Sequence, residues 1–171
     1  MKKIFFILLP LLLLTSCGST FELLNGKSSS IKMERNKAIL ITTADNGYYG
    51  DKEYGGSGRN TTNTLRTKII PYASVVDISP ERNFKHVDKD DLLNYDYVIV
   101  PELYQWEDRA TNMNFMPDKV ILGLTVYDNT GVMLNHIEIK GESTKVTMAN
   151  NDPIELVEEG LDIYIRQLFE L

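Results

Sequence analysis

The chain has 171 residues, of which 43% are hydrophobic and 25% charged, and its net charge is −6. An acidic chain without a basic stripe has no surface that would follow a phosphate backbone, which argues against a nucleic-acid partner. Its single cysteine excludes an internal disulfide. The only two histidines, His86 and His136, lack the ligand spacing of a zinc site, so we expect neither a metal nor another cofactor.

The first sixteen residues have the pattern of a signal peptide. Lys2 and Lys3 precede an apolar run over residues 4–14, which is too short to span a bilayer as a mature helix. The run ends in the sequence LTSC at residues 14–17, which resembles the lipobox of bacterial lipoproteins. That resemblance implies cleavage before Cys17 and lipid attachment to it. The alternative is an ordinary signal peptide whose cysteine falls near the cleavage site.

Lipidation of Cys17 predicts where the protein is found. A lone thiol in an oxidising compartment would be a liability, because it has no cysteine to pair with. Lipid attachment to the thiol removes that liability. Several acyl chains, at about 0.8 kcal/mol per buried methylene, anchor a protein firmly. By resemblance to enterobacterial sorting rules, Gly18 in place of aspartate favours the outer membrane, facing the periplasm, over the inner membrane. Removing residues 1–16 takes away two lysines and no acids, so the net charge of −6 becomes −8.

Residues 17–36 are predicted to be the lipidated N-terminus and a flexible tether, followed by one globular periplasmic domain over residues 37–171. The tether contains a polar stretch at residues 25–30 and lacks sustained hydrophobic periodicity. The alternative is that Phe21 and its apolar neighbours pack on the domain.

Five apolar or β-branched runs predict strands. Pro101 is expected to mark the end of the third or an edge position, and Gly131 suits the left-handed position of a short hairpin loop between the last two. The predicted strands cover residues 38–43, 74–78, 95–100, 119–127 and 132–140.

Three segments predict helices. The first covers residues 59–70 and ends at Pro71, and the third starts at Asp152 as N-cap. Between them, residues 85–94 carry a short helix in which Leu92 and Leu93 face inward. The resulting order is strand, helix, strand, short helix, three strands and helix. It predicts an α/β (α+β) fold with a single mixed sheet of about five strands and helices packed on it.

A glycine-rich segment precedes the first helix and is the first candidate site. Tyr54, Gly56, Ser57 and Gly58 stand where a helix N-terminus and backbone N–H groups bind a phosphate in many proteins. The pattern matches neither a dinucleotide fingerprint nor a Walker loop. The hypothesis of a small-anion site therefore stands beside that of a structural loop stiffened by tyrosines.

The second candidate follows the third predicted strand and contains the only tryptophan. Trp106, Glu107, Asp108 and Arg109 could form a catalytic or ligand-binding cluster, because acids beside an arginine suit such chemistry. Two alternatives remain open. The segment forms a partner-binding surface, or Trp106 fills the core while Arg109 pairs with an acid to fix the loop.

Several motifs in the same order are similar to those of an uncharacterised family of bacterial lipoproteins, classed as a domain of unknown function. The resemblance covers residues 37–171 and implies no activity. More loosely, the element order resembles the periplasmic modules of curli-secretion lipoproteins and of the N-terminal part of the Tol-system β-propeller protein, as a likeness of fold only. The matching motifs are YG at 49–50, YGGSG at 54–58, YDYV at 95–98, WEDRAT at 106–111, PDK at 117–119, GES at 141–143 and NDP at 151–153.

The sequence thus predicts a membrane-anchored lipoprotein that is not an enzyme and serves as an adaptor or assembly component of the cell envelope. Its expected partners are the membrane, through Cys17, and an envelope protein or further copies of itself. The alternatives are a periplasmic hydrolase that uses the acids near Trp106, and small-anion binding at residues 56–58.

Overall fold

The computed structural model describes residues 19–25, 32–109, 116–143 and 152–169. The predicted signal peptide and Cys17 lie outside these residues. Within them, no helix has both the length and the apolar composition needed to cross a membrane.

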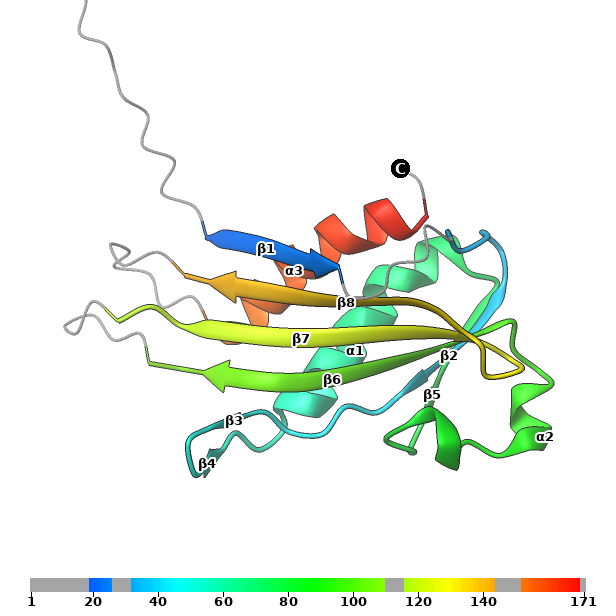
Figure 1. Cartoon of the computed structure of the whole chain (residues 1–171), viewed down its shortest axis with the longest axis horizontal. Helices are drawn as coiled ribbons and strands as arrows, with labels where there is room; N and C mark the ends of the chain where they lie inside the picture. Colours follow the sequence, from blue (N-terminus) through cyan, green and yellow to red (C-terminus); the bar gives the residue numbers. More distant parts are fainter. Residues whose placement is uncertain (1–18, 26–31, 110–115, 144–151, 170–171) are drawn as a thin grey trace, which may run out of the picture.

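The fold is built on one six-stranded mixed sheet in the order β1-β8-β7-β6-β2-β5 (Figure 1). β2 pairs in parallel with β5 and β6, and all other neighbours are antiparallel. The predicted α+β class is confirmed, with one strand more than the five expected. The strands are β1 (Thr20–Asn25), β2 (Ala38–Thr42), β5 (Val75–Ser79), β6 (Tyr97–Glu107), β7 (Lys119–Asp128) and β8 (Met133–Glu142).

β1 shows that the prediction of a flexible tether over residues 17–36 is wrong for residues 20–25. This strand pairs with β8 along its whole length, from Thr20 opposite Glu142 to Asn25 opposite Ile137. Phe21 and Leu23 pack against the main core. The alternation that places them inward lasts only a few residues and runs into a polar stretch, so periodicity did not reveal it. The folded domain therefore begins well before residue 37.

Two helices cover one face of the sheet, α1 (Ser57–Ile69) and α3 (Pro153–Leu168) (Figure 1). The Asp152 carboxylate accepts a hydrogen bond of 3.0 Å from the Ile154 amide and caps α3 as predicted. A short 3₁₀ turn, η1 (Ile70–Tyr72), follows α1 at Pro71. The apolar stripe of α3 is buried, at about 1.5–3 kcal/mol for each large side chain. It consists of Leu156, Val157, Leu161, Tyr164, Ile165 and Leu168.

The other face is covered only near its α2 end, by η2 (Phe84–His86) and the single-turn helix α2 (Lys89–Leu92). Here a second, smaller core packs against β2 and β6. Leu92 is buried as predicted, but Leu93 is 79% exposed, so its predicted inward position is wrong. Because α2 makes only one turn, two adjacent residues cannot both reach the sheet.

The third predicted strand is longer than expected, because β6 continues through Pro101 to Glu107. Pairing with β2 ends at Ile99, so beyond it β6 has a strand neighbour in the main sheet only on its β7 side. At such an edge position the missing N–H of proline removes no ladder hydrogen bond. Trp106 and Glu107 consequently lie in a strand rather than in a loop.

The β7–β8 hairpin forms as predicted. Gly131 has φ +88° in its turn. The Asp128 carboxylate accepts hydrogen bonds from the amides of Thr130 and Val132, each 2.9 Å long. The glycine-rich segment also contains a two-stranded sheet, β3 (Tyr48–Tyr49) with β4 (Lys52–Glu53).

Candidate functional site

The two candidate segments lie together at one end of the sheet. β6 and β8 end there, β7 begins there, and the β3–β4 hairpin stands beside them, at the left of Figure 1. The register places Thr20, Glu142, Lys119 and Glu107 in one row across four strands. We call this end, with the residues on and beside that row, the motif end. The opposite end carries α2 and the turn of the β7–β8 hairpin.

The amides of Gly56, Ser57 and Gly58 already have hydrogen-bond partners. The Asn46 side-chain oxygen accepts from Gly56 N at 3.0 Å and from Gly58 N at 3.3 Å. The Ser57 hydroxyl accepts from Gly47 N at 2.8 Å and donates to the Tyr54 carbonyl at 2.7 Å. An anion bound to these amides would have to displace Asn46. The side chain of Asn46 in the same loop therefore satisfies the amides of Gly56 and Gly58, as in a turn whose role is structural.

Trp106 joins the two candidate segments. Its side chain is only 5% exposed and belongs to the main core. A Cβ atom on Gly47 would lie 2.5 Å from Trp106 Cβ, so only glycine lets the loop approach this closely. The Tyr54 hydroxyl donates to the Asp108 carbonyl at 3.5 Å. This geometry agrees with the hypothesis in which Trp106 fills the core.

Glu107 and Arg109 form an ion pair at the end of β6. Arg109 Nη2 lies 2.5 Å from Glu107 Oε2, and the two side chains are 26% and 6% exposed. Gln105 donates a further hydrogen bond to Glu107. The Arg109 guanidinium also stacks over the Tyr49 ring at 5.1 Å and donates to its hydroxyl at 3.3 Å. Glu107 is thus enclosed by protein donors, whereas Asp108 beside it is exposed.

Asp118, a buried acid that did not stand out in the sequence, ties three segments together. Its carboxylate accepts from Arg109 N at 2.5 Å. Its own amide donates to the Ser143 hydroxyl at 2.8 Å, and Ser143 N returns a bond of 3.0 Å to its carbonyl. The only sequence signal was its membership of the PDK motif, because a single acid after a proline is otherwise ordinary. Asp118 fixes the ends of β6, β7 and β8 relative to one another.

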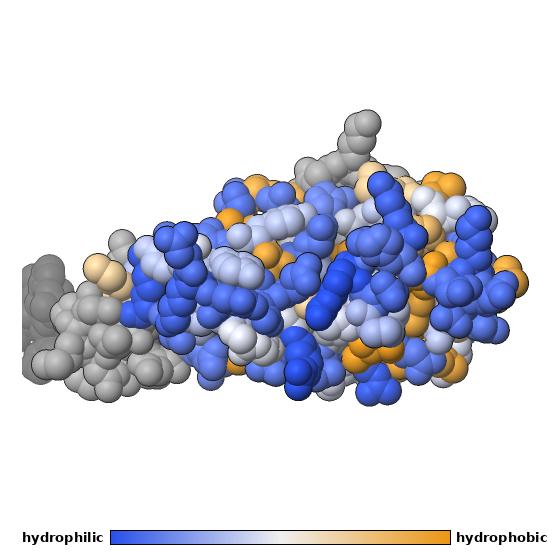
Figure 2. All heavy atoms as spheres, turned by 90° about the horizontal axis from the view of Figure 1, so that it is seen from below, coloured by the Kyte–Doolittle hydropathy of each residue, from blue (hydrophilic) through white to orange (hydrophobic). Residues whose placement is uncertain are grey.

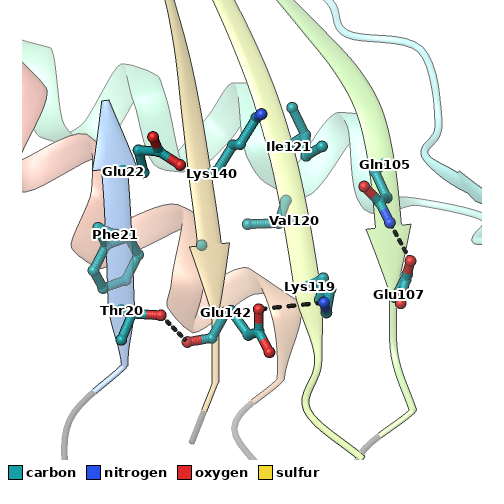
Figure 3. Close-up of a pocket in the computed structure, with 11 residues that line it drawn as sticks. Thr20, Phe21, Glu22, Gln105, Glu107, Lys119, Val120, Ile121, Lys140 and Glu142 are labelled. Carbon is teal, nitrogen blue, oxygen red and sulfur yellow. Dashed lines mark hydrogen bonds and ion pairs between the residues drawn. The ribbon is translucent and has the colours of Figure 1, made fainter. Parts of the chain in front are cut away.

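Two hollows lie at the motif end. One, of about 450 Å³, opens on the uncovered sheet face between β1, β8, β7 and β6 (Figure 3). Lys119 and Glu142 form an ion pair of 3.2 Å in it. The other, of about 370 Å³, lies beside the glycine-rich segment and is lined by Tyr54, Trp106 and Asp108, among others.

Further along the same open face, Tyr104 lies across Gly123. A Cβ atom on Gly123 would be 2.6 Å from the tyrosine ring, so the glycine makes room for it. Burial against the sheet and the nearby Glu102 carboxylate, which accepts a 3.1 Å hydrogen bond from the hydroxyl, raise the pKa of Tyr104 to about 12. Tyr104 is therefore a neutral hydrogen-bond donor at neutral pH.

Within the described ranges, no group of three or more histidine, cysteine, aspartate or glutamate side chains is arranged to hold a metal ion. Nδ1 of His136 lies 2.9 Å from the Thr125 hydroxyl on the hairpin, and Nδ1 of His86 lies 3.2 Å from the Asn83 amide nitrogen, remote from the motif end. The motif end therefore brings together the buried Trp106, the Glu107–Arg109 ion pair and the buried Asp118 carboxylate. All of them hold backbone segments in place.

This architecture defines an α+β domain in which α1 and α3 cover one face of a six-stranded mixed sheet and the other face is largely open. The chain belongs to the family described as a domain of unknown function, DUF4823, whose model matches residues 31–168. None of the curated proteins matches it in sequence.

Solved structures of very different sequence share the fold. The PelC dodecamer from Paraburkholderia phytofirmans is 12% identical, with a TM-score of 0.61 over 84% of this chain and 95% of that one. The hypothetical protein CT253 from Chlamydia trachomatis is 7% identical, with a TM-score of 0.52 over 80% and 100%. XCC0632 from Xanthomonas campestris, of the family DUF330, is 7% identical, with a TM-score of 0.51 over 83% and 87%. These likenesses extend to the fold alone.

Proposed function

We propose that this protein is an exported lipoprotein, anchored through Cys17, that acts as a non-catalytic assembly component of the cell envelope. The anchor is supported by the signal-like residues 1–16 and by the LTSC sequence before the domain. Lipids on Cys17 would hold the domain on the periplasmic face of the outer membrane.

The observation that carries the non-catalytic role is the internal use of the motif side chains. Trp106 is packed against Gly47, and Glu107 is buried in a pair with Arg109. The amides that an anion would need are bonded to Asn46. A catalytic acid must reach substrate, and only Asp108 of the two acids beside Trp106 is exposed. Such an arrangement favours a rigid scaffold over a reaction centre.

Self-association is the form of assembly that we favour. The structurally similar PelC is a dodecamer, so this fold is compatible with large assemblies of identical copies. Apolar residues gather toward the end that carries α2, at the right of Figure 2. Leu93 there is 79% exposed, and Val132, on the hairpin next to the glycine that contacts Phe84, is 57% exposed. Exposed apolar side chains of this kind are common where proteins bind partners.

Crosslinking in intact cells, followed by native mass spectrometry of the detergent-solubilised full chain, tests the assembly role. We expect one defined oligomer or one defined envelope partner, and Leu93→Ser should weaken it while exposed Asn129→Ser does not. A monomer without crosslinked partners contradicts the proposal. So does substrate turnover by the wild-type protein that Asp108→Asn abolishes.

Membrane attachment is tested separately. The N-terminal peptide of the mature protein should carry the mass of an acylated cysteine, and Cys17→Ser should release the protein from the membrane fraction. An unmodified Cys17 on a membrane-free protein contradicts the anchor.

A further inference from the structure

We propose that the motif end of the domain rests directly on the phospholipid surface to which Cys17 is anchored. This inference builds on the proposed lipidation of Cys17 and adds an orientation to it. Cys17 precedes Thr20, the first residue of β1, by only three residues. Three extended steps span at most about 11 Å. The start of β1 is therefore held within about 11 Å of the lipid-bearing residue, instead of swinging on a tether of twenty residues.

The register extends this constraint across the sheet. Thr20 lies in one row with Glu142, Lys119 and Glu107, and Figure 3 shows the four side by side at the ends of their strands. β6 has 11 residues, so the opposite end of the sheet lies about 35 Å further along the strands. The short linker that holds Thr20 near the membrane therefore also holds the motif end there. The one alternative is that the strands run parallel to the membrane with the β1 edge against it, which we call the lying orientation.

The lying orientation is the alternative to this one. α3 packs beneath β1 and β8, since a Cβ atom on Gly160 would lie 2.5 Å from Ile139 and 3.5 Å from Phe21. Its exposed acids Glu155, Glu158 and Glu159 lie in its first two turns, and its N-cap Asp152 lines the hollow beside Trp106 at the motif end. Anionic headgroups would repel these carboxylates in either orientation, so the choice between the two rests on the exposed apolar side chains.

The motif end offers a more suitable contact surface. Two of its cations are paired with acids, Lys119 with Glu142 at 3.2 Å and Arg109 with Glu107 at 2.5 Å. The acids Asp51, Glu53 and Asp108 are exposed at the same end, so attraction to anionic lipid does not account for the contact. Its exposed side chains include aromatic and apolar ones, which suit the headgroup region of a bilayer because rings with a polar tip are stable there. They are Tyr48 (49% exposed), Tyr49 (42%) and Met116 (52%). These side chains and the short linker to Cys17 together favour a phospholipid bilayer as the occupant of this surface.

Energy transfer to labelled lipid headgroups tests the orientation. Full-length protein is purified from membranes with one added thiol, Met116→Cys at the motif end or Asn129→Cys in the β7–β8 turn at the α2 end, and each thiol is coupled to the same donor dye. Cys17 is the chain's only native cysteine, and its acylated form does not react. The proteins are reconstituted into vesicles of phosphatidylethanolamine and phosphatidylglycerol that carry a headgroup acceptor.

We expect transfer from position 116 to be at least about threefold more efficient than from position 129, because the two ends differ by about 35 Å. Equal transfer from both positions, or stronger transfer from position 129, overturns the orientation. If Met116→Cys does not fold, Tyr48→Cys at the same end, where the native side chain is 49% exposed, takes its place with the same dye and the same two outcomes.

Mass spectrometry of the same samples separates the two proposals. An acylated Cys17 with the wrong transfer pattern refutes the orientation alone, whereas an unmodified Cys17 refutes the anchor and the orientation with it.

Discussion

Gly58→Ala should destabilise the domain, because a glycine at position 58 lets the first turn of α1 pack directly against the backbone that follows β2. A Cβ atom on Gly58 would lie 2.5 Å from the Asp45 carbonyl oxygen and still closer to that of Ala44. Both obstacles are backbone atoms, which cannot rotate away as a side chain can. Overpacking of this kind costs about 1–3 kcal/mol. Alanine recovers up to about 1 kcal/mol through its higher helix propensity, so we expect a net loss of about 1–2 kcal/mol.

Gly55→Ala is the matched control for this prediction. It lies three residues earlier in the same loop, and a Cβ atom there would meet nothing within 4 Å. Urea unfolding followed by Trp106 fluorescence measures both variants. Gly55→Ala should stay within about 0.5 kcal/mol of the wild type. Gly58→Ala with the stability of Gly55→Ala would refute the close approach of α1 to β2 on which the reasoning rests.

Three further outcomes are expected. Trp106→Ala should lose about 3–5 kcal/mol of unfolding free energy, because it leaves a large void in the main core; a loss below about 1 kcal/mol in urea unfolding followed by far-UV circular dichroism, which needs no tryptophan, would contradict its buried position. Glu107→Gln should cost about 1–2 kcal/mol in the same assay by leaving Arg109 without its carboxylate, while Asp108→Asn, at an exposed side chain, changes stability by less than about 0.5 kcal/mol. The third concerns acid. Hydrogen bonds from Thr130 and Val132 outweigh partial burial and lower the pKa of Asp128. The stabilisation is therefore complete above the unfolded pKa, near 3.8, and is lost as the pH falls through the lower folded pKa. The difference in melting temperature between wild type and Asp128→Asn should shrink between pH 6 and pH 2, as calorimetry can measure, and a constant difference would argue against this role.

Local chemistry predicted much of the fold. Asp152 and Gly131 act at the expected cap and turn because the reason for each is contained within a few residues. β1 escaped prediction because its partner lies near residue 140, and a short edge strand has little periodicity of its own. Pro101 was expected to mark a strand end or an edge, and the structure shows the edge, because the β2–β6 pairing ends at Ile99 while β6 continues to Glu107. Which of the two a proline marks depends on the neighbouring strand, and the sequence around it does not reveal that strand.

The candidate site was predicted in its parts but not as a whole. Trp106 and the glycine-rich segment were both singled out, yet their contact through Gly47 joins residues 59 positions apart, which no local pattern reveals. Asp118 was passed over because its role depends on Ser143 and Arg109, each on a different segment.

The pairing of β1 with β8 also bears on when the chain can fold. Residues 20–25 must wait for residues 137–142, so the first strand to be synthesised is completed by one of the last. Closing a loop of more than a hundred residues is entropically costly and slow, and contacts of such high sequence separation form late. β1 consequently has no partner strand until residues 137–142 have been synthesised. The burial of Phe21 and Leu23 against the main core therefore depends on the C-terminal third of the chain.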